Sequence, residues 1–170
     1  MHNLPPPAFQ GIAEYVVSVE IDAPLDNVWA IVTDLKSYPL CRSAIIVDDS
    51  SHKPTEDQSL RAEATLELAM QMPPSLETSK KPTVGYEHVG LVDHATHRVT
   101  WGGGRVPNLF RAEHSHALSA TGDGKTLCET RHVFGGLSGY PIKCFMSRTM
   151  RQCLEDMLNA LKQRAETQSD

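Results

Sequence analysis

The sequence lacks a long apolar run, an excess of basic residues and a paired-cysteine motif. A membrane-spanning helix needs roughly 20 apolar residues, so we expect no membrane insertion. The net charge of −5 argues against a nucleic-acid partner, because nucleic-acid-binding surfaces are usually basic. The four cysteines show no C-x-x-C spacing and the amino terminus has no apolar signal segment. We therefore expect reduced thiols and a cytoplasmic location.

The chain also lacks internal repeats and interdomain linkers, and its 170 residues suit one domain. We predict a flexible amino-terminal arm at 1–10, which contains three prolines, a single domain at 11–166 and a frayed tail at 167–170. We expect a monomer or a homodimer.

Alternating apolar residues predict strands, and a helical period predicts helices. The strands are expected at 12–21, 43–49, 60–70, 83–93, 97–103, 109–120 and 125–134. Two short helices should follow the first strand, at about 24–33 and from Asp34 to Pro39. From about Pro141 a long helix should bury a stripe that includes Phe145 and Met146. This order predicts an α+β protein whose sheet is covered by its terminal helix.

The stretch "RAEHSHALSATGDGKTLCETRHVFGG" holds His114, His116 and His132 on the two strands of a predicted hairpin. Alternate strand residues share a face, so the three imidazoles should point the same way as Phe134. We expect that face to point inward. The opposite faces should meet solvent, with Glu113, Ser115, Glu129 and Arg131 on them.

Several segments together resemble a known family: "VEIDAPLDNVWAIVTDLKSYP", "VTWGGG", "AEHSHAL", "GKT", "HVFGG" and "CLEDMLNALKQRAE". They are similar to the START-like, Bet v 1-like (SRPBCC) superfamily, in its polyketide cyclase/dehydrase-like branch, from about Ile12 to Glu166. The resemblance implies a helix-grip fold, in which a curved seven-stranded antiparallel sheet wraps a long carboxyl-terminal helix. Two short helices follow the first strand, and a deep apolar cavity takes a hydrophobic small molecule. It implies no cofactor.

The chain departs from the family pattern at two of its histidines. The family often shows His-x-Phe-x-Leu on a late strand, where this sequence has His114, His116 and Leu118. His132 stands where the family often has a glutamate. The branch's usual chemistry therefore does not transfer to these positions residue by residue.

Our leading hypothesis is an enzyme of secondary metabolism that cyclises, dehydrates or isomerises a polyketide- or terpenoid-like molecule, as a lyase or isomerase. His114 and His132 would exchange protons with the substrate, and His116 would position them or share the proton, because imidazole titrates near neutral pH. The candidate substrate-binding residues are Trp101, Phe134, Tyr38, Thr130, Leu118, Tyr86, His88 and Arg105.

Three alternatives remain open. The protein could be a non-catalytic carrier or receptor for a hydrophobic ligand, with the histidines bound to its polar head. It could be an interaction module of the kind that regulates a chaperone. The three histidines could also hold a metal, since their spacing allows it. We favour a metal-free cluster, and we expect no stoichiometric zinc, iron or copper.

Overall fold

The computed structural model describes residues 3–35, 43–70, 83–104, 106 and 108–169. Its strands are β1 (Ala13–Ile21), β2 (Ser43–Val47), β3 (Thr65–Met70), β4 (Thr83–Asp93), β5 (Arg98–Gly103), β6 (Arg111–Ala120) and β7 (Thr126–Gly135). Its helical segments are α1 (Leu25–Thr33), a 3-10 turn η2 (Gly122–Gly124), α2 (Gly139–Pro141), a π-helical turn η3 (Ile142–Met146) and α3 (Ser147–Ser169).

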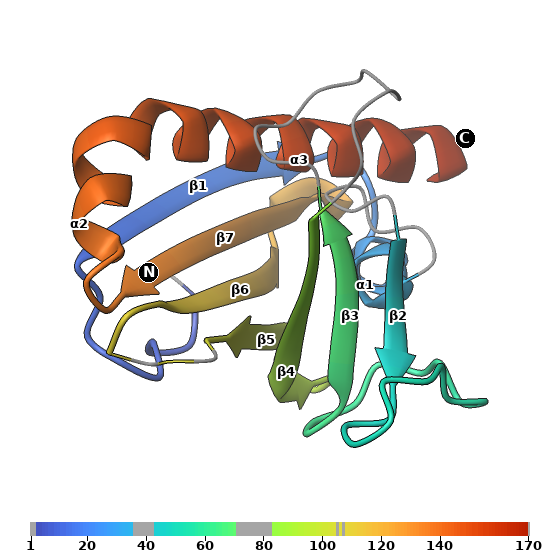
Figure 1. Cartoon of the computed structure of the whole chain (residues 1–170). Helices are drawn as coiled ribbons and strands as arrows, with labels where there is room; N and C mark the ends of the chain where they lie inside the picture. The colour runs from blue at the N-terminus through green and yellow to red at the C-terminus, as the bar shows by residue number, and fades with distance from the viewer. Residues whose placement is uncertain (1–2, 36–42, 71–82, 105, 107, 170) are drawn as a thin grey trace.

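The seven strands form one antiparallel sheet in the order β1-β7-β6-β5-β4-β3-β2. The sheet curves, and α3 lies along it beside β1 (Figure 1). This arrangement confirms the predicted helix-grip fold. Of the two short helices predicted after the first strand, α1 is present. The second falls on residues 36–39, outside the described residues.

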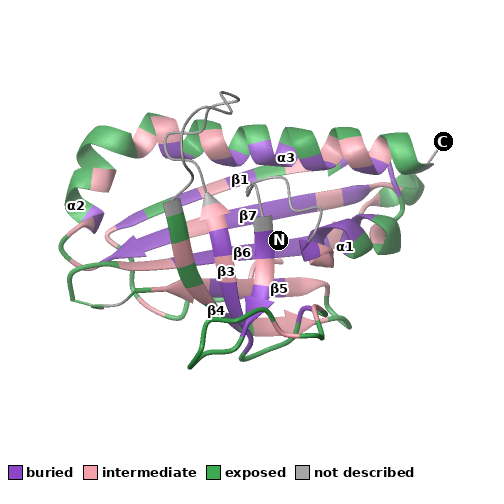
Figure 2. Cartoon of the chain, turned by 45° about the vertical axis from the view of Figure 1, so that its right-hand side comes forward, coloured by how far each residue is buried: buried purple, intermediate pink, exposed green. Residues whose placement is uncertain are grey.

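The core lies between the concave face of the sheet and α3 (Figure 2). The buried side chains of α3 recur at helical spacing: Met150, Leu154, Met157, Leu158, Leu161 and Ala165. The prediction that Phe145 and Met146 continue this stripe is wrong, because both are exposed. Both lie in the π-helical turn η3, which has no buried residue. At 3.6 residues per turn Phe145 lies nearly opposite the buried stripe of α3, so it does not continue that stripe.

The prediction that the convex face meets solvent is also wrong for four residues of β6 and β7. Glu113, Glu129 and Arg131 were expected to meet solvent, as was Ser115, yet all four are buried. The amino-terminal segment lies against these residues. The Asn3 backbone N–H donates to Oε2 of Glu129 (2.8 Å).

Further along the segment, Arg131 Nη2 donates to the carbonyl of Pro5 (2.6 Å), and the Ala8 N–H donates to Oε2 of Glu113 (2.9 Å). Glu113 and Arg131 also form an ion pair (3.7 Å). Hydrogen-bonded partners are what allow charged groups to be buried. The amino-terminal segment, which was predicted to be a flexible arm, thus makes polar contacts with the sheet. The predicted mobility of this segment stays a prediction.

No helix in the described part of the chain is long and apolar enough to cross a membrane.

Candidate functional site

Four aromatic and imidazole side chains form a row across the concave face. The strand register places Trp101 opposite His114, His114 opposite His132, and His132 opposite Tyr15. Directly paired residues of an antiparallel sheet share a face. The Trp101 ring stacks on His114 at 5.0 Å between ring centroids, and His132 meets His114 edge-on at 4.2 Å. The sequence pattern therefore predicted the shared face of these histidines correctly.

His116 joins the row from the same strand as His114. Nε2 of His114 and Nε2 of His116 lie 2.8 Å apart, so one donates a proton to the other. Thr130 donates its hydroxyl to the carbonyl of Ser115 (3.1 Å), and the same oxygen lies 3.3 Å from Nε2 of His114. Because the Thr130 hydroxyl proton already bonds the Ser115 carbonyl, the Thr130 oxygen can accept a hydrogen bond from His114. The arrangement favours the tautomer in which His114 carries its proton on Nε2.

Burial makes all three imidazoles weakly basic. It lowers the pKa of His132 to about 4, and burial with repulsion from a protonated His132 lowers that of His116 to about 3. Burial holds the pKa of His114 well below its usual value, and repulsion from His132 and then from His116 lowers this pKa further. All three are therefore neutral at pH 7. Only His132 is half-buried, whereas His114 and His116 are 2% and 1% exposed. His132 is thus the histidine best placed to touch a ligand.

The other nominated binding residues divide by location. Phe134 and Leu118 are buried in the core, and the Phe134 and Tyr15 rings pack edge to face with their centroids 6.2 Å apart. Tyr86 and His88 are exposed and form hydrogen bonds with side chains of β3 on the convex face of the sheet. The Tyr86 hydroxyl donates to Oε2 of Glu67 (2.9 Å), and Nδ1 of His88 lies 3.1 Å from the Thr65 hydroxyl. They therefore lie apart from the histidine row. Tyr38 and Arg105 fall outside the described residues.

The sequence analysis missed Glu87. This residue lies between Tyr86 and His88 and faces the opposite way, on the side of the buried Val89. Although its side chain is only half-buried by exposed area, burial raises the pKa of the carboxyl to about 7. The strand has apolar residues on both faces, so alternation could not show which face points inward.

Small residues separate Glu87 from the histidines. A Cβ added to Gly103 would lie 3.3 Å from Cγ of Glu87, which places that side chain over the glycine. Gly103 pairs with Ala112, and Ala112 pairs with Phe134. This second row, next to that of the histidines, therefore has bulky side chains at its ends and little between them. Gly103 itself allows the close approach of β4, since a Cβ there would lie 2.7 Å from the Tyr86 carbonyl oxygen.

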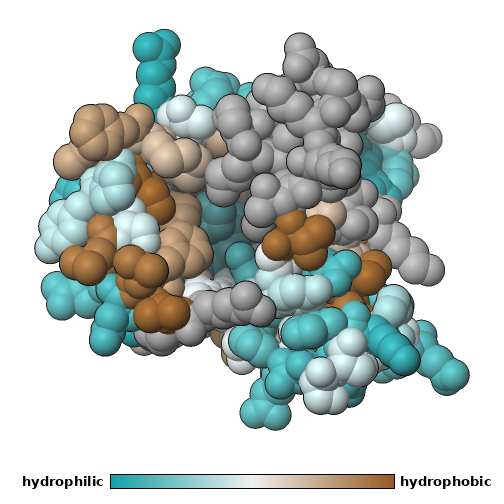
Figure 3. Space-filling view, in the orientation of Figure 1, coloured by the Kyte–Doolittle hydropathy of each residue, from teal (hydrophilic) through white to brown (hydrophobic). Residues whose placement is uncertain are grey.

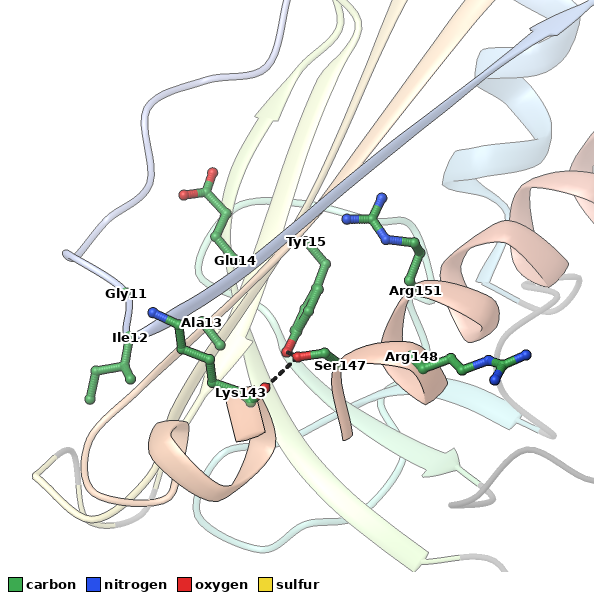
Figure 4. A pocket seen from close by; sticks show the side chains of 9 residues that line it. All are labelled: Gly11, Ile12, Ala13, Glu14, Tyr15, Lys143, Ser147, Arg148 and Arg151. Carbon is green, nitrogen blue, oxygen red and sulfur yellow. Dashed lines mark hydrogen bonds between the residues drawn. The ribbon is translucent and has the colours of Figure 1, made fainter. Parts of the chain in front are cut away.

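A pocket of about 700 Å³ opens between the first residues of β1 and the start of α3 (Figure 4). Its lining residues are Gly11, Ile12, Ala13, Glu14, Tyr15, Lys143, Ser147, Arg148 and Arg151. Tyr15 points from β1 toward Ser147, and the two hydroxyls lie 2.9 Å apart. The histidines do not line this pocket, so the predicted cavity beside them stays a prediction. Tyr15 is the residue common to the pocket and the histidine row.

In the described residues, no group of three or more His, Cys, Asp or Glu side chains is arranged to hold a metal. For His114 and His116 the short Nε2–Nε2 contact gives a physical reason. One Nε2 carries the proton and the other directs its lone pair at that proton, so neither nitrogen offers a free lone pair to an ion.

Solved structures of similar fold are distant in sequence. A hypothetical protein from Helicobacter pylori superposes with a TM-score of 0.70 at 10% identity, covering 91% of this chain and 89% of that one. The di-domain ARO/CYC protein BexL, from the BE-7585A biosynthetic pathway, gives 0.65 at 15% identity over 89% of this chain and 45% of its own. Norcoclaurine synthase from Thalictrum gives 0.61 at 10% identity, over 93% and 96%. These likenesses show the fold alone.

A search of curated protein sequences finds no relative of this chain. The family described as "Polyketide cyclase / dehydrase and lipid transport" matches residues 13–166, which contain the whole sheet and nearly all of α3. The chain therefore belongs to this polyketide cyclase/dehydrase and lipid transport family, within the START-like, Bet v 1-like superfamily.

Proposed function

We propose that this protein is a cofactor-independent enzyme that cyclises, dehydrates or isomerises a largely apolar small molecule on the concave face of its sheet. The observation that carries the proposal is the row Tyr15, His132, His114, with His116 bonded behind it. Proton-carrying side chains seldom line an apolar core without partners or a purpose, because each needs a hydrogen bond there. Membership of a family that includes cyclases supports the same reading.

The exposure of the histidines divides their roles. His132, which is half-buried, would take a proton from a carbon next to a substrate carbonyl. His114 and His116, which are buried, would act as positioning residues that orient His132 and stabilise its protonated form. The proton would return to the enolate or alkoxide oxygen.

Glu87 would serve as a second proton carrier. Its raised pKa leaves it partly protonated near neutrality, so it can give or accept a proton there. It lies two strands from His114 and His116 and three strands from His132, about 10 and 14 Å across the sheet. A multi-ring substrate spans such a distance, and the apolar surroundings would hold it in one reactive conformation.

The test compares His132→Gln and His114→Gln with His88→Gln as the matched control, because His88 lies on the convex face. The probe is a linear polyketide thioester analogue, and mass spectrometry follows loss of water and the formation of cyclised product. His132→Gln should slow turnover by about a hundredfold or more, while His88→Gln keeps the wild-type rate. The affinity for an apolar fluorescent probe should change little in His132→Gln or in His88→Gln.

Near-normal rates in both His114→Gln and His132→Gln would show that neither histidine acts as an essential acid or base.

The second candidate function is that of a non-catalytic carrier. Its support is that the Nε2 atoms of His114 and His116 already bond each other and so need no substrate at those atoms. Mass spectrometry that finds a chemically unchanged lipid copurified with the protein, together with no turnover, would establish the carrier.

A further inference from the structure

Exposed apolar side chains gather at one end of the molecule, where the β5–β6 turn meets the segment between β7 and α3. We call this surface the apolar end. Its members are Val106, Leu109, Phe110, Leu137, Tyr140, Phe145 and Met146. Brown and tan side chains at the left of Figure 3 mark the same region, over α2 and the β5–β6 turn. In the described part of the chain, only Val84 and Tyr86 are large exposed apolar residues elsewhere. A contiguous apolar patch of this kind marks an interaction site.

The apolar end has a defined backbone structure, because hydrogen bonds join the β5–β6 turn to the segment after β7. The Leu137 N–H donates to the carbonyl of Asn108 (3.0 Å), and the Ser138 N–H donates to that of Leu109 (2.9 Å). The Ser138 hydroxyl donates to the same carbonyl of Leu109. Gly136 adopts φ +73°, and a Cβ there would lie 2.7 Å from the carbonyl carbon of Leu109. The backbone thus holds the apolar side chains in place before any partner arrives.

Phe145 extends furthest into solvent. It is 85% exposed. It lies in the π-helical turn η3, which has no buried residue. Such turns often occur at functional sites. Leu137, at 67% exposed, is the next most exposed member.

Charge at this end opposes that of the whole chain. Residues 94–112 and 130–154 contain no aspartate or glutamate, although the chain carries 21 acidic residues and a net charge of −5. Lys143, Arg148 and Arg151 are exposed here, and none of them forms an ion pair with a described acidic side chain. The apolar end is therefore bordered by three cations, with Glu14 as the one carboxylate that lines the same pocket.

We propose that the apolar end docks the protein onto the surface of an anionic lipid bilayer. Exposed aromatic and aliphatic side chains would enter the headgroup region, and the adjacent cations would bind lipid phosphates. A second copy of the chain suits this surface poorly, because an isologous contact would bring two like-charged sets together. The pocket at Tyr15 shares Lys143, Arg148 and Arg151 with this end, so a docked molecule would hold its pocket beside the bilayer.

Vesicle co-sedimentation tests the proposal, with vesicles of phosphatidylcholine alone and of phosphatidylcholine mixed with phosphatidylglycerol. The protein should bind the mixed vesicles, and high salt should weaken binding because it screens the charges. Phe145→Ser should weaken binding by about tenfold. Lys143→Glu should weaken it by at least about fivefold, since each cation near the surface contributes roughly that factor.

Two matched variants control for general effects. Val84→Ser removes an exposed apolar side chain on β4, and Lys53→Glu reverses an exposed lysine in the loop after β2. Both should bind like the wild type, and circular dichroism should confirm that every variant is folded. Failure to bind the anionic vesicles, or equal binding by Phe145→Ser, would overturn the proposal. So would self-association without vesicles that Phe145→Ser abolishes, because a second copy would then cover this end.

Discussion

At the residue scale, two kinds of buried group on the concave face respond to pH in opposite directions. The folded-state pKa values of His116 and His132 lie below the usual 6.5. Their contribution to stability is therefore full above pH 6.5 and is lost as the pH falls toward their folded values of about 3 and 4. The folded pKa of Glu87 is raised from 4.5 to about 7. Its contribution is full below pH 4.5 and is lost as the pH rises through 7.

Glu87→Gln isolates the carboxylate, because it removes the charge and keeps the shape. The variant should be more stable than the wild type at pH 8, by at most about 3 kcal/mol, and by less where solvent screens the carboxylate. At pH 4.5 the two should nearly coincide, since the wild-type carboxyl is then protonated in the folded state. Urea unfolding at both pH values measures the difference, with the exposed Glu56→Gln as control. An equal change in the free energy of unfolding at both pH values would show that the Glu87 carboxyl is not shielded from solvent.

At the scale of elements, the contact between the β5–β6 turn and the end of β7 sets the shape of the apolar end. This contact depends on the lack of a side chain at Gly136, whose backbone is left-handed and close to Leu109. A Cβ there would both strain the backbone and push the two segments apart.

Gly136→Ala should therefore lower the free energy of unfolding by about 2 kcal/mol. Gly122→Ala is the matched control, because a Cβ at Gly122 meets nothing within 4 Å, and it should be nearly neutral. Thermal unfolding of the two variants measures the contrast. Equal midpoints would mean that the turn adapts to the added methyl group.

At the scale of the whole molecule, the sheet is covered on both sides. The helix α3 covers the concave face, and the amino-terminal segment lies on the convex face through Asn3, Pro5 and Ala8. From these contacts we expect an ordered segment, whereas the sequence pattern predicts a flexible arm. They also surround an ion pair that would otherwise meet water.

Removal of residues 1–9 should lower the free energy of unfolding by about 2 to 4 kcal/mol, because hydrogen bonds to the charged groups are lost and solvent replaces them only in part. Denaturant unfolding measures this, and a chain lacking residues 168–170 serves as the control. Hydrogen exchange gives an independent measure, since the amides of Asn3 and Ala8 should exchange slowly. Fast exchange with an unchanged midpoint would establish the flexible arm.

Most of the fold could be predicted from the sequence, because its signals are local. The alternation around His114 and His132, the glycines of the turn at 122–124, and the Pro24 and Asp26 start of α1 each specify an element within a few residues. The candidate site was predictable only in part. The shared face of His114, His116 and His132 follows from alternation, whereas the inward direction of Glu87 depends on which face of β4 meets the core.

The sequence by itself determined which residues share a face, since the periods of strands and helices are properties of the backbone. Tertiary structure alone decided what covers each face. The charges at Glu113 and Arg131 follow the pattern of a solvent face, yet a segment more than a hundred residues away in the chain buries them. Phe145 was predicted to join a buried stripe, yet it is exposed in the π-helical turn that precedes α3. Burial depends on contacts between distant segments, and local periodicity carries no information about them.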